Sequence, residues 1–263
     1  MAEKKQKYYY LVIGNWKMNP TTLREAKGIY RDVKKNAGRW SGIRVVTAPP
    51  ATYLAPLADY KSPANFELGG QNCFFEESGS HTGEISYAML KDLGCRWVIL
   101  GHSERRAQGE DSATVARKAG AVLSAGLRPV ICVGEEKRDA EGEYLAELEN
   151  QILASVKGVK EADLPRVVIA YEPVWAIGRK DNRALSGESV LEMNIFIKRS
   201  LSRKYSRKKA MSVEVLYGGS VTADNTREIV ESGQVNGLLV GRQSLEPVAF
   251  AQILDLVKQV KDS

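Results

Sequence analysis

Short apolar runs alternate along the chain with longer segments in which apolar positions recur at helical spacing. Short apolar runs bounded by polar residues or glycine are typical of buried strands, and the longer segments are typical of amphipathic helices. The predicted strands are Tyr9–Ile13, Ile43–Ala48, Phe66–Gly70, Trp97–Leu100, Arg128–Val133, Arg166–Ala170, Val213–Leu216 and Gly237–Val240. The pattern is therefore one of repeated strand-then-helix units.

Eight such units without a Pro/Gly/Ser-rich linker predict a single-domain α/β protein over residues 1–263, folded as a closed parallel (β/α)8 barrel. The length of 263 residues suits this fold, because such barrels use about 250 residues as one domain. A doubly wound open sheet is the alternative. The polar residues 1–7 are expected to form a flexible N-terminal extension.

Composition indicates an ordinary globular protein, with 43% hydrophobic and 27% charged residues. No apolar stretch approaches the ~20 residues of a membrane span, and the N-terminus has no apolar signal-peptide core. We therefore expect a cytoplasmic protein without a membrane partner. Cys73, Cys95 and Cys132 form no Cys-x-x-Cys pair and are expected to be buried, reduced thiols rather than metal ligands.

The net charge of +6 raises the question of a nucleic-acid partner. Much of the excess lies in Lys198–Lys209, which follows an amphipathic stretch. A solvated helix end and loop is the favoured interpretation, and a polyanion-binding patch is the alternative. We expect no nucleic-acid partner.

Polar side chains that can transfer protons follow three of the predicted strands. Asn15 and Lys17 follow the first strand, His102 and Glu104 follow the fourth, and Glu172 follows the sixth. The carboxyl ends of parallel strands meet at one rim, where barrel enzymes carry their chemistry. Asn15 and Lys17 are expected to point the same way if the chain stays extended between them.

Glycine-rich segments follow the last two strands, at 218–220 and at Gly241. Barrel enzymes often bind phosphate with backbone N–H groups of the loops after strands 7 and 8. This layout predicts a small phosphorylated substrate.

Six motifs carry a resemblance to a known family, in the family's order and across nearly the whole chain. They are NWKMN (15–19), GHSERR (101–106), CVGE (132–135), YEPVWAIG (171–178), YGGSV (217–221) and NGLLVG (236–241). With these motifs the chain resembles the triosephosphate isomerases, which are TIM-barrel enzymes. The resemblance implies interconversion of dihydroxyacetone phosphate and D-glyceraldehyde 3-phosphate through an enediol(ate), in glycolysis and gluconeogenesis.

The resemblance also implies a role for each catalytic candidate. Glu172 is expected to be the base, and His102 is expected to be the neutral hydrogen-bond donor to the developing enediolate. Lys17 would supply positive charge, Asn15 a hydrogen bond, and Glu104 would hold the Lys17 ammonium in position. No cofactor or metal is implied, and the chain has no dinucleotide-type glycine fingerprint.

Further residues follow from the same resemblance. The expected lid residues are Pro173, Val174, Trp175, Ala176, Ile177 and Gly178, and the expected phosphate contacts are Asn15, Lys17, Gly178, Ser220, Gly241 and Arg242. Two features depart from the family: a longer, charged hinge at 179–187, and Arg242 where a second glycine is common. For Arg242 we expect the N–H to face the phosphate and the side chain to have a structural role.

The segment Gly79–Glu84 is similar to the family loop that reaches into a neighbouring subunit. This similarity implies a homodimer with Thr82 in the interface, and leaves a tetramer possible. His81 is then an interface or surface residue rather than a catalytic one. Two rival functions are an isomerase or lyase of another small sugar phosphate, and a polyanion-binding protein built on an inactive barrel.

Overall fold

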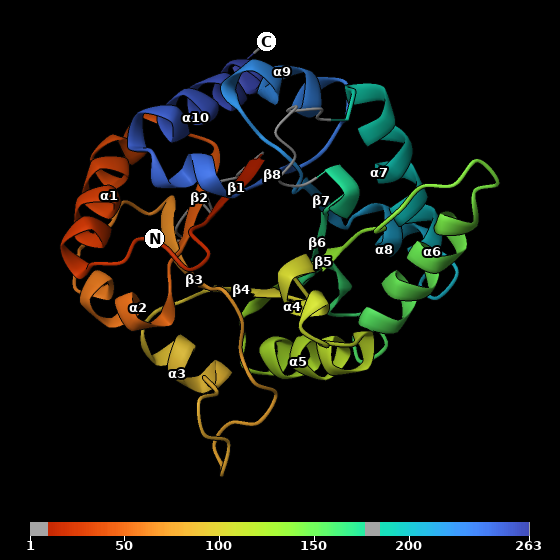
Figure 1. Cartoon of the computed structure of the whole chain (residues 1–263), viewed down its shortest axis with the longest axis horizontal. Helices are drawn as coiled ribbons and strands as arrows, with labels where there is room; N and C mark the ends of the chain where they lie inside the picture. The colour runs from red at the N-terminus through yellow and green to blue at the C-terminus, as the bar shows by residue number, and fades with distance from the viewer. Residues whose placement is uncertain (1–9, 177–184, 263) are drawn as a thin grey trace, which may run out of the picture.

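Eight parallel strands close into a barrel in the order β1–β8 (Figure 1). The computed structural model describes residues 10–176 and 185–262, so the predicted extension at residues 1–7 lies outside it. The strands are β1 (Tyr10–Asn15), β2 (Ile43–Ala48), β3 (Phe66–Gly70), β4 (Trp97–Leu100), β5 (Arg128–Val133), β6 (Val168–Tyr171), β7 (Glu214–Tyr217) and β8 (Gly237–Val240). The prediction of a single-domain (β/α)8 barrel is confirmed.

An outer ring of helices surrounds these strands (Figure 1). The α-helices are α1 (Leu23–Asn36), α2 (Ala51–Ala58), α3 (Tyr87–Asp92), α4 (Ser103–Ala107), α5 (Ser112–Ser124), α6 (Glu143–Ser155), α7 (Gly187–Leu201), α8 (Arg207–Met211), α9 (Ala223–Glu231) and α10 (Pro247–Asp262). Four short 3-10 turns are η1 (Ala37–Arg39), η2 (Leu164–Arg166), η3 (Val174–Ala176) and η4 (Arg242–Leu245). Hydroxyl or carboxylate caps mark several helix starts; for example, Asp111 accepts a 2.7 Å bond from the Thr114 N–H at the start of α5.

Five strands have the predicted bounds, and β1, β6 and β7 end later than predicted. Arg166 belongs to η2 rather than to β6, and its guanidinium donates to the carbonyls of Leu123 and Leu127. Tyr171 and Tyr217 extend β6 and β7 because they pair with each other in the parallel register. The prediction ended these strands too early because a tyrosine beside glycine or a polar residue also suits a loop.

Pairing of β1 with β8 closes the sheet and excludes the open-sheet alternative. Gly237, with φ 150°, lies where the two strands approach each other. A Cβ at this position would lie 1.8 Å from the Leu11 carbonyl oxygen. Only glycine fits this close approach, so Gly237 allows the β1–β8 pairing that closes the barrel.

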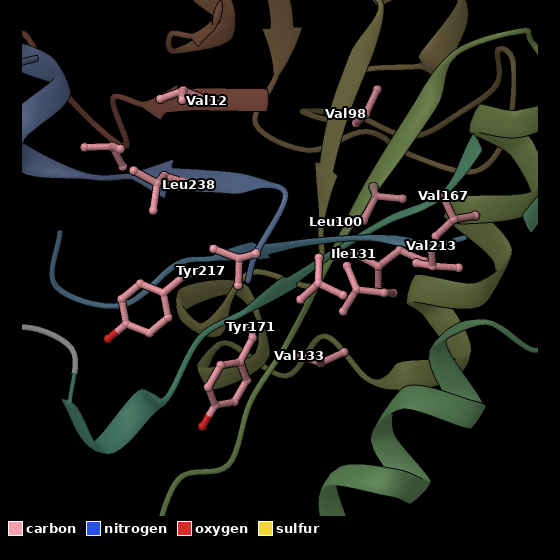
Figure 2. Close-up of a cluster of buried hydrophobic side chains, with 14 of the residues drawn as sticks. Val12, Val98, Leu100, Ile131, Val133, Val167, Tyr171, Val213, Tyr217 and Leu238 are labelled. Carbon is pink, nitrogen blue, oxygen red and sulfur yellow. The ribbon is translucent and has the colours of Figure 1, made fainter. Parts of the chain in front are cut away.

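Two apolar clusters occupy the two faces of the barrel wall. Alternate strand residues such as Ile13, Ile99 and Val168 form the inner cluster, and their neighbours pack against the helices. Figure 2 shows part of the outer cluster, including Leu100 and Ile131. Because both faces are buried, most strand positions are apolar instead of alternating with polar ones, and the charged exceptions, such as Arg44, Glu67 and Glu214, lie near the strand starts.

The three cysteines are buried as predicted, and one lysine of the basic stretch has backbone partners. Cys73, Cys95 and Cys132 are free and buried. In the basic stretch, the Lys204 ammonium donates to the carbonyls of Val156 and Lys157 at 2.8 and 2.9 Å. Part of this positive charge therefore caps neighbouring backbone instead of forming a free patch.

Candidate functional site

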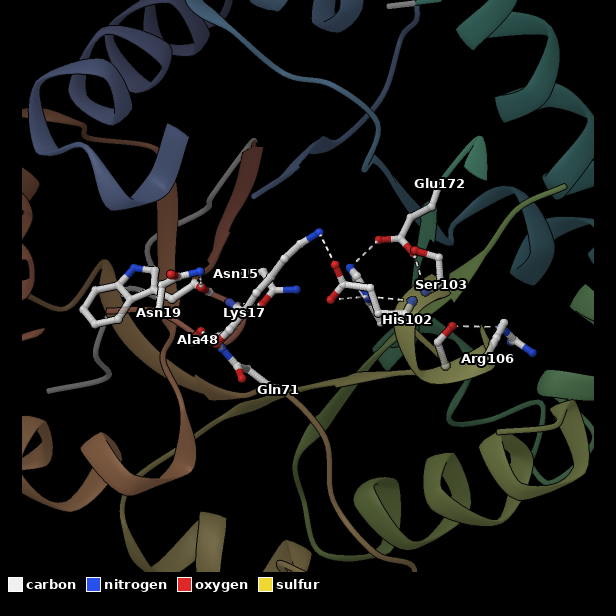
Figure 3. A network of polar contacts seen from close by, with 12 residues as sticks. Asn15, Lys17, Asn19, Ala48, Gln71, His102, Ser103, Arg106 and Glu172 are labelled. Atoms are coloured by element: carbon white, nitrogen blue, oxygen red, sulfur yellow. Dashed lines mark hydrogen bonds and ion pairs between the residues drawn. The ribbon is translucent and has the colours of Figure 1, made fainter. Parts of the chain in front are cut away.

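The barrel's carboxyl rim brings together the five predicted catalytic side chains, of which Figure 3 labels Asn15, Lys17, His102 and Glu172. Asn15 is the last residue of β1, and Glu172 directly follows β6. His102 follows β4 after one glycine, and Glu104 lies in the first turn of α4. These residues are far apart in sequence. Their convergence was predicted from one rule, that the carboxyl ends of parallel strands meet at the same rim.

The chain leaves the extended conformation at Lys17, so the condition for a shared direction of the Asn15 and Lys17 side chains is not met. Lys17 has φ 54°, in the left-handed region, and its N–H donates to Asn15 Oδ1 at 3.0 Å. The Gln71 amide donates to the carbonyls of Lys17 and Ala48 at 2.8 and 2.9 Å. These bonds offset the cost of an unfavourable backbone conformation and fix the direction of the Lys17 side chain.

Lys17 and Glu104 form the ion pair that the sequence predicted, with 2.7 Å between Nζ and Oε1. Their side chains are 30% and 54% exposed, and exposed pairs contribute about 1 kcal/mol or less to stability. The effect of Glu104 is therefore mainly to set the position of the ammonium group.

His102 caps the helix α4 with its ring. Its Nδ1 accepts the Glu104 backbone N–H at 3.2 Å. This bond matches the tautomer that carries the ring proton on Nε2. The Nε2–H group is thus available to a partner at the rim.

Glu172 is that partner, and its side chain is only 3% exposed. Oε1 lies 3.2 Å from His102 Nε2, and Oε2 accepts the Ser103 N–H at 3.0 Å. Glycines make room for it: a Cβ on Gly134 would lie 1.8 Å from the Glu172 carbonyl oxygen, and one on Gly218 would lie 2.9 Å from its Cγ. Both glycines occur in motifs noted in the sequence.

Four of the predicted lid residues, Pro173, Val174, Trp175 and Ala176, follow Glu172 and include the turn η3. The indole of Trp175 donates to Glu135 Oε1 at 2.9 Å, and the hydroxyl of Tyr171 donates to the same atom at 2.8 Å. Burial and the Glu135 charge raise the pKa of Tyr171 well above its usual range, so its hydroxyl stays a donor. Ile177, Gly178 and most of the charged hinge lie outside the described residues.

The predicted phosphate contacts after β7 and β8 lie on the same rim. Ser220 Oγ donates to the Ala176 carbonyl at 3.4 Å, next to the predicted lid. A Cβ on Gly241 would lie 3.6 Å from Lys17 Cε, so this glycine is close to the ammonium side chain. Arg242 starts η4 with an exposed side chain, and the structure gives no support for the structural role expected of it.

Three supporting residues were not assigned roles from the sequence. Gln71 directly follows β3, so the strand-end rule applied to that strand would have found it. Glu135 and Arg106 stand inside noted motifs, but no sequence pattern shows that a charged residue is buried. These contacts depend on distant strands and need the fold.

Arg106 joins β4 to β5 and α6 beneath the site. Its guanidinium donates to the Gly101 and Cys132 carbonyls at 2.8 and 3.1 Å and to the hydroxyls of Ser112 and Ser155 at 3.0 and 3.1 Å. Burial lowers the pKa of Arg106. The four bonds compensate for this desolvation and hold the segment that carries His102.

Arg106→Lys is expected to lower the free energy of unfolding by about 2–3 kcal/mol, because lysine cannot reproduce the forked hydrogen bonds. Denaturant unfolding at one fixed protein concentration measures this change. Arg207→Lys, at an exposed position, is the control and should change stability by less than about 0.5 kcal/mol. Equal stability of the two variants would contradict the assigned role.

The loop between β3 and α3 projects from the ring of helices and carries His81 and Thr82 (Figure 1). Thr82 is exposed, and His81 Nε2 lies 3.0 Å from Glu76 Oε2, away from the rim. At the base of the loop, Lys118 pairs with buried Glu110 and donates to Asn72 Oδ1 at 2.9 Å. The loop is thus tied to α5. His81 lies on this loop, and His102 is the histidine at the rim.

Within residues 10–176 and 185–262, no group of three or more His, Cys, Asp or Glu side chains is arranged to hold a metal ion. None of the helices in this described part is long and apolar enough to cross a membrane.

A closed parallel barrel whose rim joins a buried carboxylate, an imidazole and an ammonium group defines an enzyme of acid–base chemistry. The family model described as triosephosphate isomerase matches residues 10–257. Triosephosphate isomerases of Rhodopirellula baltica and Coprinopsis cinerea are each 41% identical to this chain, over 93% and 95% of it and 96% and 98% of their own lengths. The triosephosphate isomerase of Chloroflexus aurantiacus is also 41% identical, over 93% of this chain and 97% of its own length. The chain belongs to the triosephosphate isomerase family and is an isomerase.

Proposed function

We propose that the chain interconverts dihydroxyacetone phosphate and D-glyceraldehyde 3-phosphate through an enediol(ate), in glycolysis and gluconeogenesis. The observation that carries this proposal is the convergence of Glu172, His102 and Lys17 on one barrel rim. A base, a neutral donor and a fixed cation are the groups that a proton shift beside a carbonyl needs.

Glu172 is the base in this proposal. It takes the proton from one substrate carbon and returns it to the neighbouring carbon, and a carboxylate can do both on one face of the substrate. The 3% exposure of its side chain supports this role, because few water molecules compete for its oxygens.

His102 donates from Nε2–H to the oxygens on which negative charge develops. The bond from the Glu104 N–H to Nδ1 supports this role, because it fixes the tautomer before substrate binds. Glu172 Oε1, at 3.2 Å from Nε2, stands beside the same reacting atoms.

Lys17 and Asn15 complete the polar surface around the substrate. The ammonium group stabilises both the phosphate and the developing oxyanion, and Glu104 holds that ammonium in position. The amide of Asn15 donates a hydrogen bond, and its Oδ1 meanwhile holds the Lys17 N–H.

For the phosphate we propose backbone N–H groups of Ser220, Gly241 and Arg242, with Gly178 as a further contact outside the described residues. The segment beginning with Pro173 is the proposed lid, and its anchor is the Trp175 bond to Glu135. The proton shift itself requires no cofactor, so none is proposed.

The first test is the rate at which the purified chain converts D-glyceraldehyde 3-phosphate into dihydroxyacetone phosphate. Fast turnover is expected, with much slower turnover of tetrose and pentose phosphates, because the site must enclose the substrate. Preference for another sugar phosphate would favour the rival isomerase. A folded chain without turnover of any of them would overturn the proposed activity.

We also propose a homodimer in which Thr82 reaches the partner subunit, supported by the projecting, anchored loop that carries it. A cytoplasmic location stays a further proposal, supported by three free buried thiols.

Thr82→Glu is expected to convert most of the dimer to monomer at micromolar concentration, because the substitution buries an unpaired charge in the interface. Sedimentation velocity measures the two species. Val248→Glu adds the same charge at a 74% exposed position on α10 and should leave the dimer intact. A monomeric wild-type chain would remove the proposed interface altogether.

A further inference from the structure

A charged pocket of about 480 Å³ lies at the amino-terminal ends of the strands, opposite the candidate site. The charged and aromatic residues that line it are Arg44, Glu67, Lys91, Arg96, Trp97 and Arg128. Trp97 and Arg128 are the first residues of β4 and β5, and Arg44 is the second residue of β2. We call this feature the amino-terminal pocket.

Trp97 organises the cations of the amino-terminal pocket. The guanidinium carbons of Arg128 and Arg44 lie 4.4 and 5.7 Å from the centre of its ring. The indole N–H donates to Glu67 Oε2 at 2.5 Å, which fixes the ring. A buried, hydrogen-bonded indole therefore holds two guanidinium groups in place before any ligand arrives.

Cations from three different segments line the pocket. Among residues 10–176 and 185–262, Glu67 lies between Arg44 and Arg96, and Glu214 pairs with Arg128 at 3.2 Å. Burial lowers the pKa of the Arg128 guanidinium; the Glu214 carboxylate opposes this shift, and the Arg44 charge adds to it. Crowded, partly buried cations of this kind are stabilised by a bound anion.

Arg96 lies at the open side of the pocket. Its side chain is 73% exposed, and its Nη1 lies 3.8 Å from Glu67 Oε1, which is beyond a normal hydrogen bond. It also borders a second hollow of about 270 Å³. At the pocket edge, no heavy atom outside the neighbouring residues lies within 4 Å of a Cβ built on Gly94 or Gly126.

We propose that the amino-terminal pocket binds a phosphate-type dianion, held by Arg96, Arg128 and Lys91. Arg96 just before β4, Arg128 of β5 and Lys91 of α3 line one pocket, so an anion of phosphate size in it meets guanidinium and ammonium groups together. The dianion is either free inorganic phosphate or the phosphate group of a small metabolite. The inference does not rest on the proposed reaction, because the pocket shares no residue with the catalytic rim.

The indole NMR signals of the four tryptophans separate this site from the catalytic one. Inorganic phosphate is titrated into the full chain at constant ionic strength, with chloride as the reference salt. The Trp97 signal, assigned with Trp97→Phe, is expected to shift saturably, whereas binding at the catalytic rim shifts the Trp175 signal. A Trp97 shift that is linear, or equal in chloride, would overturn the proposal.

A pair of double variants tests the assigned cations. Lys91→Gln/Arg96→Gln is expected to raise the apparent Kd read from Trp97 by about five-fold or more. Lys208→Gln/Lys209→Gln removes the same charge elsewhere and should leave that Kd unchanged. Both pairs replace exposed or partly exposed side chains, so both double variants are expected to fold. The dispersion of their NMR spectra checks this. Equal weakening in both pairs would reduce the binding to general charge attraction and overturn the site.

The source of the dianion is read from the same signal. Glycerol 2-phosphate is titrated in parallel with inorganic phosphate. A lower Kd for the ester indicates a phosphorylated metabolite, and a lower Kd for inorganic phosphate indicates the free ion. Absence of a Trp97 response to either would exclude the proposed ligand class.

Discussion

Glu172→Gln is expected to lower kcat by about 10²- to 10⁴-fold with little change in KM, the usual contribution of a positioned base. The amide keeps the volume of the carboxylate and can still contact Ser103 and His102, but it does not accept a proton from carbon. Steady-state kinetics with D-glyceraldehyde 3-phosphate measures the loss. Because the side chain is buried, circular dichroism must accompany the assay to show that the variant folds.

The matched control is Glu136→Gln, the same substitution at an exposed position after β5. It should retain wild-type kcat, which also rules out an effect of overall charge. Near-normal turnover by Glu172→Gln would assign the base to another group, for which the rim offers the carboxylate of Glu104.

The sequence was most informative where the main chain itself fixes the position of a side chain. His102, Glu172 and Asn15 stand at or directly after strand ends, so one rule about parallel strands brought them together before the fold was known. Lys17 shows the limit of that rule. Its left-handed backbone depends on hydrogen bonds from Gln71, which comes from another strand, so spacing alone could not predict its path.

The long-range polar contacts of the site could not be predicted from the sequence. Glu135 accepts bonds from Tyr171, Trp175 and Arg138, and these partners come from different segments around the rim. A buried carboxylate and an exposed one look alike in sequence, because burial is a property of the packed elements. The predicted strand bounds failed for the same reason at Tyr171, whose strand partner is 46 positions away at Tyr217.

His102→Gln is expected to lower kcat by about 10²- to 10³-fold, the cost of losing one donor to a developing oxyanion. The glutamine amide does not reproduce the ring's fixed donor, because the Glu104 N–H orients the imidazole through Nδ1. KM should change little, since the donor acts mainly after the proton has left carbon. The measurement is again steady-state turnover of D-glyceraldehyde 3-phosphate.

The chain's other histidine supplies the control. His81→Gln, on the projecting loop and 34% exposed at its side chain, should retain kcat when assayed at a protein concentration that favours the dimer. Because Glu172 Oε1 lies 3.2 Å from His102 Nε2, the double variant Glu172→Gln/His102→Gln should lose less than the product of the two single losses. Strictly multiplicative losses would mean that the two groups act in separate steps, and a fully active His102→Gln would remove the imidazole from the proposed chemistry.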